Sequence, residues 1–373
     1  MSGYFLYHSI GTFPGKAQAV SASLSSFARL WSAEDDSQWP AALQQRQMFI
    51  AAWESLIEAP GGTLTTSENV TTALYSLLGS LPPGTLTGRR VLVAGDCFPS
   101  LHFLLSGLAS RLGFTLDTVP VRLGEAWVRD DDVLARWQAD VALALLTQVT
   151  STSSHRCDLT TLLAHGRSKG SLVGVDITQG VGVVPFSVAA LAPDFVVSSS
   201  LKWLCGTSGA GILQVRPDLL AQCEPELRGW FSQPNPFSWD LEAFTYAPDA
   251  RRFDHGTPAI LASIASLPGL QWVAEVGVDA IAAHNRAMSE KLVDWSASRG
   301  LRLVSPAAPE KRGGSVMIGL PDSVAAAWIV NELRSQKIYC DARGTTLRLS
   351  PGAVTSSEDI TRLCQALDQL LPA

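Results

Sequence analysis

Charge is what this chain has least of. Asp, Glu, Lys and Arg make up 17% of its 373 residues, against about a quarter in typical soluble domains. The formal net charge is −6 and no basic cluster is present, which argues against nucleic acid and anionic membrane surfaces as partners. No apolar run reaches the length of a membrane-spanning helix, and no charged leader precedes an apolar stretch. We therefore expect a cytoplasmic protein that binds neither nucleic acid nor membrane.

Paired cysteines are also lacking. The six cysteines are scattered without CxxC spacing, which excludes the usual zinc motif and favours reduced thiols over disulfides. We therefore expect no metal site. Hydrophobic residues, in contrast, reach 46%, which is enough for a large core. The length suggests about two domains, and the sparsely charged surface points to an oligomer.

Strands alternate with helices through the middle of the sequence. Short apolar runs predict strands at 90–94, 140–146, 172–175, 195–197 and 212–215. Helical periodicity predicts helices at 44–58, 100–112 and 158–169. This alternation is typical of an α/β fold with a mostly parallel sheet and right-handed crossovers.

The pattern changes after Pro258. A long helical stretch at 260–299, interrupted near Gly269 and Gly277, precedes a β-α-β-β-α succession that ends near residue 371. That succession predicts a compact α+β unit. We expect a large domain at 45–258 and a small domain at 259–373, with residues 1–44 packing along the cleft and the small domain.

Lys202 lies in the most informative segment. The strand at 195–197 leads into three serines (198–200), and three glycines and a second strand follow the lysine. The hydroxyls, Ser199 among them, could bind a phosphate. A lysine in a low-dielectric pocket has its pKa lowered towards the free amine, the nucleophile that forms a Schiff base with a carbonyl. A solvated lysine in a surface turn explains Lys202 alone equally well.

Asp176, upstream of the lysine, favours the Schiff-base role of Lys202 over the solvated turn. The strand at 172–175 ends at this residue, and Gly180 and Gly182 follow. Ligands of parallel sheets lie at the carboxyl ends of the strands. Alone, Asp176 is more typical of a cap or loop residue. An acid there, followed by a strand and a lysine, matches pyridoxal 5'-phosphate (PLP) chemistry: the acid keeps the ring nitrogen protonated and the lysine holds the aldehyde.

A hydroxyl-rich stretch at 65–72 begins a further predicted helix, which runs to about Leu78. Backbone amides at that helix start, at Asn69 and Val70, could bind the phosphate. An ordinary capping box that begins at Thr66 or Ser67 accounts for the same residues equally well.

From about residue 45 to residue 371, the chain resembles the fold-type I PLP enzymes of the class V aminotransferase group, and within that group most of all the kynureninases. The resemblance implies a large domain with a mostly parallel sheet and a smaller C-terminal α+β domain. Besides the Asp176 and Lys202 segments, it rests on the motifs at 95–100, 228–231, 255–258, 312–315, 339–343 and 347–351.

The resemblance also implies roles for individual residues. Phe98 would stack on the cofactor ring, and Gln179 would contact the ring hydroxyl side. Trp230 would donate to the phosphate, and Thr257 would reach the phosphate of a neighbouring subunit, which implies a homodimer with its sites at the interface. Arg348 would bind the substrate carboxylate. The predicted cofactor-binding set is Asn69, Val70, Phe98, Asp176, Gln179, Ser199, Lys202, Trp230 and Thr257, with Lys202 also catalytic.

The residue type of Arg348 independently supports binding of the substrate carboxylate, because a guanidinium can form two parallel hydrogen bonds with a carboxylate. An exposed position on an edge strand is the alternative explanation. Trp230 and Phe98 could likewise be ordinary core aromatics.

The chain departs from the kynureninases at three polar positions. Leu201 stands where they have a tyrosine, Leu101 where they have an acidic residue, and Gln179 where they have a histidine. Losing a phenol and a carboxylate should weaken general acid–base chemistry by orders of magnitude. Kynureninase activity itself is therefore not expected.

Cysteine desulfurases, which are related, need a mobile thiol. Cys340 lies within a predicted strand, so a buried structural role fits it better, and Cys97 has no evident base. The expected function is a PLP-dependent enzyme on an α-amino acid, most simply an aminotransferase. A kynureninase-like C–C hydrolase or C–S lyase is the alternative, followed by a PLP-binding protein without turnover.

Overall fold

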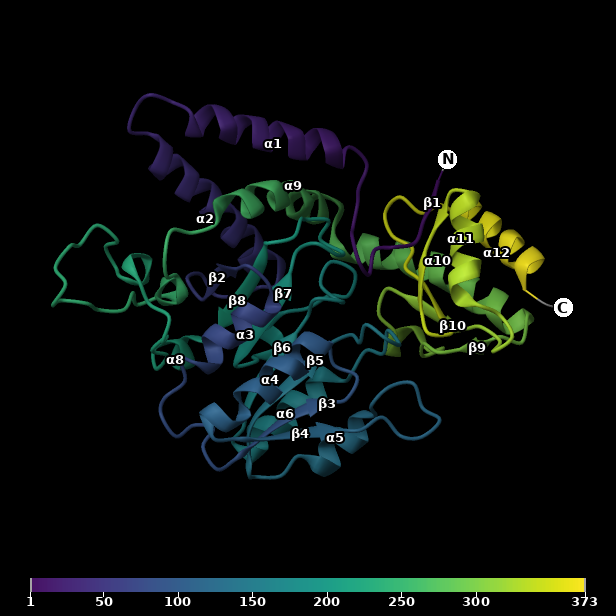
Figure 1. Ribbon diagram of the computed structural model, residues 1–373, viewed down its shortest axis with the longest axis horizontal. Helices are drawn as coiled ribbons and strands as arrows, with labels where there is room; N and C mark the ends of the chain where they lie inside the picture. The colour runs from purple at the N-terminus through teal and green to yellow at the C-terminus, as the bar shows by residue number, and fades with distance from the viewer. Residues whose placement is uncertain (1, 372–373) are drawn as a thin grey trace.

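A seven-stranded sheet forms the centre of the computed structural model, which describes residues 2–371 (Figure 1). Its strand order is β2-β8-β7-β6-β5-β3-β4. The strands are β2 (Leu64–Ser67), β3 (Arg90–Ala94), β4 (Thr115–Val119), β5 (Val141–Thr147), β6 (Leu172–Asp176), β7 (Phe195–Ser199) and β8 (Gly211–Val215). Neighbours from β7 to β4 pair in parallel, whereas β8 is antiparallel to both β7 and β2. The α/β prediction with a mostly parallel sheet is confirmed.

Both faces of this sheet are covered by helices, as parallel strands require. On one face, strand residues such as Leu92 and Val175 pack with Trp53 of α2 and Leu162 of α6. On the other face, strand residues such as Val93, Leu145 and Val197 pack with residues of α3 and α4. The helices of this part are α2 (Gln38–Leu56), α3 (Val70–Leu78), α4 (Pro99–Leu112), α5 (Asp130–Arg136), α6 (Leu159–Lys169), α7 (Val188–Leu191) and α8 (Pro217–Leu220).

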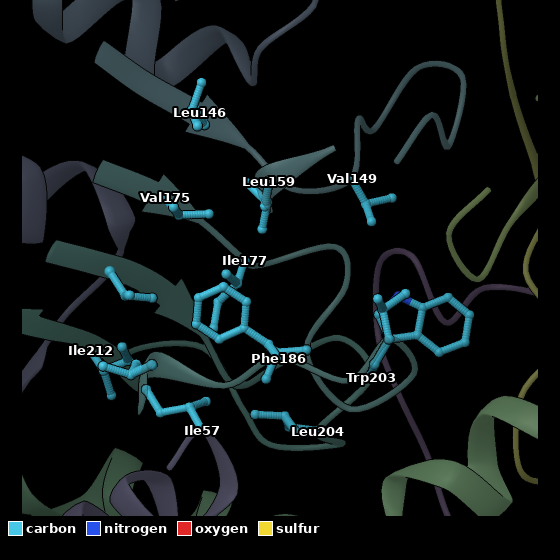
Figure 2. Packing of buried hydrophobic residues seen from close by; sticks show 14 of the residues in the cluster. Ile57, Leu146, Val149, Leu159, Val175, Ile177, Phe186, Trp203, Leu204 and Ile212 are labelled. Carbon is cyan, nitrogen blue, oxygen red and sulfur yellow. The ribbon is translucent and has the colours of Figure 1, made fainter. Parts of the chain in front are cut away.

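The first of these two layers extends beyond the strands into the loops at their carboxyl ends. Figure 2 shows part of it, in which Phe186 lies between Ile177, which follows β6, and Leu204, which follows β7. All three side chains are buried. Apolar packing thus continues directly beneath the loops that carry polar residues, which fixes their backbone.

A second sheet gathers the C-terminal strands in the order β12-β13-β10-β9. They are β9 (Arg302–Leu303), β10 (Val316–Gly319), β12 (Asp341–Arg343) and β13 (Thr346–Leu349). Around them lie α10 (Val278–Ser298), α11 (Ala326–Ser335) and α12 (Ser357–Leu370), which share a separate hydrophobic cluster. The chain start joins this unit, because β1 (Gly3–Tyr4) pairs in parallel with β11 (Ile338–Tyr339) (Figure 1).

Two helices link the two units. Helix α9 (Ile260–Val276) packs on α2 and on α1 (Lys16–Trp31), and its Leu270 and Val273 belong to the core of the large sheet. A division at residue 258 remains a proposal. Short 3-10 turns occur at η1 (Trp230–Ser232), η2 (Ala250–Phe253) and η3 (Pro309–Lys311).

Within residues 2–371, no single helix is long and apolar enough to cross a membrane; the pair α9–α10, bent by 84°, meets that length and composition only when taken together.

Three local expectations were wrong. The stretch expected to begin a helix at Thr66 or Ser67 is strand β2, and the helix starts at Val70 with Asn69 as its N-cap. Helix α9 runs through Gly269 without a break, because Pro268 and Gly269 are buried against neighbouring backbone. The helix expected at 44–58 begins at Gln38. The sequence patterns did not predict helices α1 and α5 or strand β4.

Gly11 marks a point where two backbones meet. Its N–H donates to the Leu201 carbonyl at 2.9 Å, and a Cβ built there would lie 1.8 Å from the carbonyl oxygen of Lys202. Only glycine therefore lets the N-terminal segment approach the lysine loop this closely.

Substituting Gly11→Ala should lower the free energy of unfolding by about 1–3 kcal/mol, the usual cost of overpacking. Urea denaturation measures this. Gly107→Ala is the matched control, because it lies inside α4 with open space around its Cβ position and should be neutral or stabilising by up to about 1 kcal/mol. Equal stabilities of the two variants would contradict the close approach.

Candidate active site

Three loops meet around Lys202 at the carboxyl edge of the large sheet. Strand β6 ends at Asp176, and its parallel neighbour β7 ends at Ser199, three residues before the lysine. Phe98 lies in the loop that follows β3, at the start of α4. The Lys202 Nζ atom is 5.5 Å from the centre of the Phe98 ring. Parallel pairing thus brings together residues that are far apart in the sequence.

Asp176 is a buried carboxylate with one oxygen engaged. Its Oδ1 accepts hydrogen bonds from the Thr178 backbone N–H at 2.9 Å and from the Thr178 hydroxyl. Burial raises the pKa of Asp176, while these hydrogen bonds and the charge of Lys202 oppose that rise. Because both bonds go to Oδ1, Oδ2 is left to accept a proton donor from a ligand.

Lys202 has an amine that gives up its proton easily. Its pKa is lowered to about 8 by burial and by the positive charges of Arg348 and Arg343, against the opposing charge of Asp176. At this pKa, about a tenth of the side chain is the free amine at pH 7, far more than for a solvated lysine. That is the form that attacks a carbonyl.

The start of α3 lies next to this edge. Gly211 of β8 pairs with Ser199, and a Cβ on this glycine would lie 3.1 Å from the Asn69 Cα. The Asn69 side chain caps the helix by accepting from the Thr72 N–H at 3.0 Å, and the Thr72 hydroxyl accepts from the Asn69 N–H. The Val70 amide is among the first donors of the helix, which have no acceptor inside it. The capping box therefore leaves the Val70 amide available to an anion.

Three other predicted cofactor residues make contacts elsewhere in the chain: Gln179, Trp230 and Thr257. The Gln179 Nε2 donates to the His8 carbonyl at 3.2 Å. Trp230 packs edge-on against Trp39 and Phe231. Thr257 is exposed and lines a cavity of about 330 Å³ together with Ser67, Thr72 and His255. In the part of the chain that the structure describes, neither Trp230 nor Thr257 contacts Lys202.

Arg348 comes from the small sheet. It is buried on β13, its Nε donates to Asp341 Oδ1 at 2.8 Å, and its Nη2 forms a second bond to Asp341 Oδ2. Its Nη1 points to the Ser151 carbonyl at 3.4 Å. Sequence reasoning missed Asp341 as its partner, although the two residues stand opposite each other on paired strands. It also missed His8, for which no local signal exists.

The two leucines that replace kynureninase-like polar groups differ in their surroundings. Leu101 is buried in the hydrophobic cluster between the sheet and α4. Leu201 is half-buried beside the lysine, where its carbonyl accepts from Gly11. An acidic side chain at 101 would be surrounded by apolar groups, so this position belongs to the core of this protein.

The cysteines offer no activated thiol. Cys340 and Cys97 are buried, and burial raises the pKa of each to about 12. A buried structural role for Cys340 is confirmed. Within residues 2–371, no cluster of His, Cys, Asp or Glu is arranged to hold a metal ion.

The residues at this edge fit PLP. A buried carboxylate with a free oxygen suits a protonated ring nitrogen, and a lysine with a depressed pKa suits an aldehyde. The ring of Phe98 can cover an aromatic face, and the start of α3 with Ser199 supplies donors for a phosphate. Fold and site are together those of a PLP-dependent enzyme.

Comparison with known proteins gives the family. The family model described as aminotransferase class V matches residues 55–361. The chain therefore belongs to the class V aminotransferase family of PLP enzymes. The fold-type I prediction and the PLP cofactor are confirmed. The chain is therefore an enzyme, which excludes the alternative of a PLP-binding protein without turnover.

Individual relatives carry different activities. Isopenicillin N epimerase of Streptomyces clavuligerus is 29% identical over 343 residues, 86% of this chain and 83% of that one. A kynureninase of Deinococcus radiodurans is 30% identical over 265 residues, 69% of this chain and 61% of that one. A solved structure of a C-DES variant, with glycine linked covalently to its PLP cofactor, superposes with a TM-score of 0.89 at 20% identity, covering 99% of this chain and 97% of that one.

The depressed pKa of Lys202 can be tested through cofactor attachment. The apoprotein should take up PLP covalently at a rate that rises with pH and is half-maximal near pH 8, because only the free amine reacts. The growth of the bound cofactor's absorbance measures this rate. Asp176→Asn should move the midpoint lower, because the carboxylate raises the lysine pKa. A midpoint near 10, typical of a solvated lysine, would contradict the buried environment.

Proposed function

We propose that this enzyme is an aminotransferase that acts on an α-amino acid. The observation that supports this most is the Lys202 amine, with its pKa near 8, close to Asp176 and Phe98. When bound, PLP supplies an aldehyde and an electron-withdrawing ring that stabilises negative charge at Cα. Transamination then requires little more of the protein than one base, one ring partner and one carboxylate-binding group.

In this mechanism Lys202 has two tasks. Its Nζ would hold the cofactor at the aldehyde carbon, and the amino group of the substrate would displace it there. The released Nζ would then be the base that moves the Cα proton of the substrate. A pKa near 8 suits both directions of this transfer, because catalytic bases work best when their pKa is close to the operating pH.

The other residues hold the reacting groups. Oδ2 of Asp176 would hold the proton on the ring nitrogen of bound PLP. Phe98 would cover one face of that ring and exclude water there. Arg348 binds the α-carboxylate through its remaining N–H donors, which orients the Cα–H bond towards Lys202.

A kynureninase-like C–C hydrolase or a C–S lyase is the second candidate, favoured by the 30% identity to a kynureninase. Hydrolytic cleavage needs further proton donors, and Leu101 and Leu201 offer none. Epimerisation, the activity in the name of one relative, would begin with the same removal of a Cα proton. The proposed aminotransferase therefore differs from these candidates in the steps after the Cα proton has been removed.

A panel of amino acids added to the purified holoenzyme separates these reactions. We expect conversion of the cofactor to its amine form, with release of a 2-oxo acid, and no anthranilate from kynurenine at an ordinary enzymatic rate. Arg348→Ala should weaken amino-acid binding by about 2–5 kcal/mol, the cost of deleting one partner of a desolvated charge pair. It should leave the cofactor absorbance unchanged. Product formation without the amine form of the cofactor would favour the lyase or hydrolase.

A homodimer is part of the same proposal. Thr257 and the segment around Trp230 lie away from Lys202 within one chain, and near Trp230 the side chains of Phe237, Trp239 and Leu241 are 59%, 79% and 90% exposed. Exposed apolar groups gathered in this way mark interaction surfaces. A cytoplasmic location also belongs to the proposal and is supported by six free cysteines.

Mixing two inactive variants tests the shared site. Lys202→Ala and Thr257→Ala each remove a different component, so a mixed dimer contains one site with both changes and one site with neither. Activity should therefore reappear on refolding the two variants together, up to about half of the mixed dimer's sites. If the mixture stays inactive although sedimentation shows mixed dimers, Thr257 does not act across the interface.

A further inference from the structure

The N-terminal segment at residues 3–12 runs from the small sheet to the lysine loop. Its strand β1 pairs with β11, Leu6 forms a bridge with Ser350, and Gly11 bonds the Leu201 carbonyl. Figure 1 shows this first part of the chain passing beside the C-terminal unit before it continues into α1. Side chains in the middle of the segment therefore lie between Lys202 and β13.

His8 is the polar side chain buried at this crossing, with 3% of its surface exposed. Its Nδ1 lies 2.6 Å from the Ser350 hydroxyl, and its Nε2 lies 3.1 Å from Asp341 Oδ1. The same Oδ1 accepts from Arg348. Contacts thus run without interruption from His8 through Asp341 to the guanidinium.

The chemistry of the partners fixes the form of this histidine. Burial lowers its pKa, so the neutral ring carries one N–H. Asp341 can only accept, so the proton belongs on Nε2. Nδ1 then accepts from Ser350, whose oxygen is 2.6 Å from the Ser315 hydroxyl and can accept from it. Nδ1 therefore has a hydrogen-bond partner, whereas Nε2 lies 3.1 Å from Asp341 Oδ1 without completing a hydrogen bond of good geometry.

Asp341 occupies one side of the guanidinium and leaves another side open. It takes the Nε and Nη2 donors, which share one edge of the planar group. The edge formed by Nη1 and Nη2 still has N–H groups, one of them towards Ser151. That second edge matches a carboxylate with two parallel bonds. Asp341 therefore sets the plane in which Arg348 offers its free edge.

The Asp341 carboxylate requires a second contact to hold its orientation. It lies on the edge strand β12 and is only half-buried, whereas Arg348 is buried. Without a second contact the carboxylate could turn towards water, and the guanidinium would lose the partner that orients it. His8 supplies a second contact, at the same Oδ1 that accepts from the Arg348 Nε.

We infer that His8 is a positioning residue for recognition of the substrate's α-carboxylate, acting through Asp341 on Arg348. The inference rests on the proposed role of Arg348. It assigns to the N-terminal segment a part in substrate binding that lies outside the cofactor-binding residues. His8 does not touch the substrate, so its effect should follow the carboxylate alone.

The effect on carboxylate recognition is isolated by comparing an amine that has a carboxylate with one that lacks it. L-alanine and ethylamine are titrated into the holoenzyme, and binding is followed by the cofactor absorbance and by calorimetry. His8→Ala should raise the Kd for L-alanine up to about tenfold, because Asp341 loses the imidazole that lies 3.1 Å from its Oδ1 and orients Arg348 less firmly. The Kd for ethylamine should stay unchanged, and so should the absorbance of the free holoenzyme.

Two conservative variants separate the two ring contacts. His8→Gln can place an N–H near the position of Nε2 and should restore much of the L-alanine affinity through Asp341. His8→Asn reaches only the Nδ1 side, towards Ser350, and should not. Tyr4→Phe is the control, because it removes a different hydrogen bond of the same segment, from Tyr4 to the Ile10 carbonyl. If His8→Ala fails to fold, the Gln and Asn pair decides alone.

The outcomes are distinct. Equal loss of L-alanine and ethylamine binding, or wild-type binding of both by His8→Ala, would overturn the role of His8. So would equal behaviour of His8→Gln and His8→Asn. If Arg348→Ala loses L-alanine affinity while His8→Ala does not, this inference alone is wrong. If Arg348→Ala also binds L-alanine normally, the proposed carboxylate site is wrong, and this inference with it.

Discussion

A carboxylate and an amine buried at one edge of a parallel sheet are the constraint on which the site depends. Burying either charge is costly unless partners compensate it. Asp176 is held by Thr178, and its charge and that of Lys202 act on each other. The remaining cost appears as shifted pKa values, raised for Asp176 and lowered for Lys202, and the lowered value favours the free amine that reacts with an aldehyde. The tight apolar layer below these loops prevents their relaxation towards water.

The substrate side is built from another part of the chain. Arg348 lies on the small sheet, and the N-terminal segment connects that sheet with the lysine loop. Gly11 allows two backbones to approach, and His8 faces the small sheet from the same segment. A buried arginine is stable there because Asp341 neutralises it. The Lys202 loop and the sheet that carries Arg348 are thus connected through one short stretch of backbone.

The family and the reaction are determined by different residues. Relatives of this chain are named as an epimerase and as kynureninases, although the family uses one cofactor. Reaction type depends on which proton donors surround it. Here Leu101 belongs to the core and Leu201 stands beside Lys202. This apolar pair is in keeping with the proposed aminotransferase, whose proton transfers need no side chain besides Lys202.

The sequence by itself determined the alternating strands and helices, the carboxyl-end position of Asp176 and the loop of Lys202, because these follow from local periodicity and from the geometry of parallel strands. It misplaced the start of α3, where a threonine-rich strand and a helix cap share the same residue types. Only the tertiary structure decided that Asp341 pairs with Arg348 and that His8 joins them. His8 and Asp341 stand hundreds of positions apart, and no local pattern encodes a contact whose partner is supplied by packing.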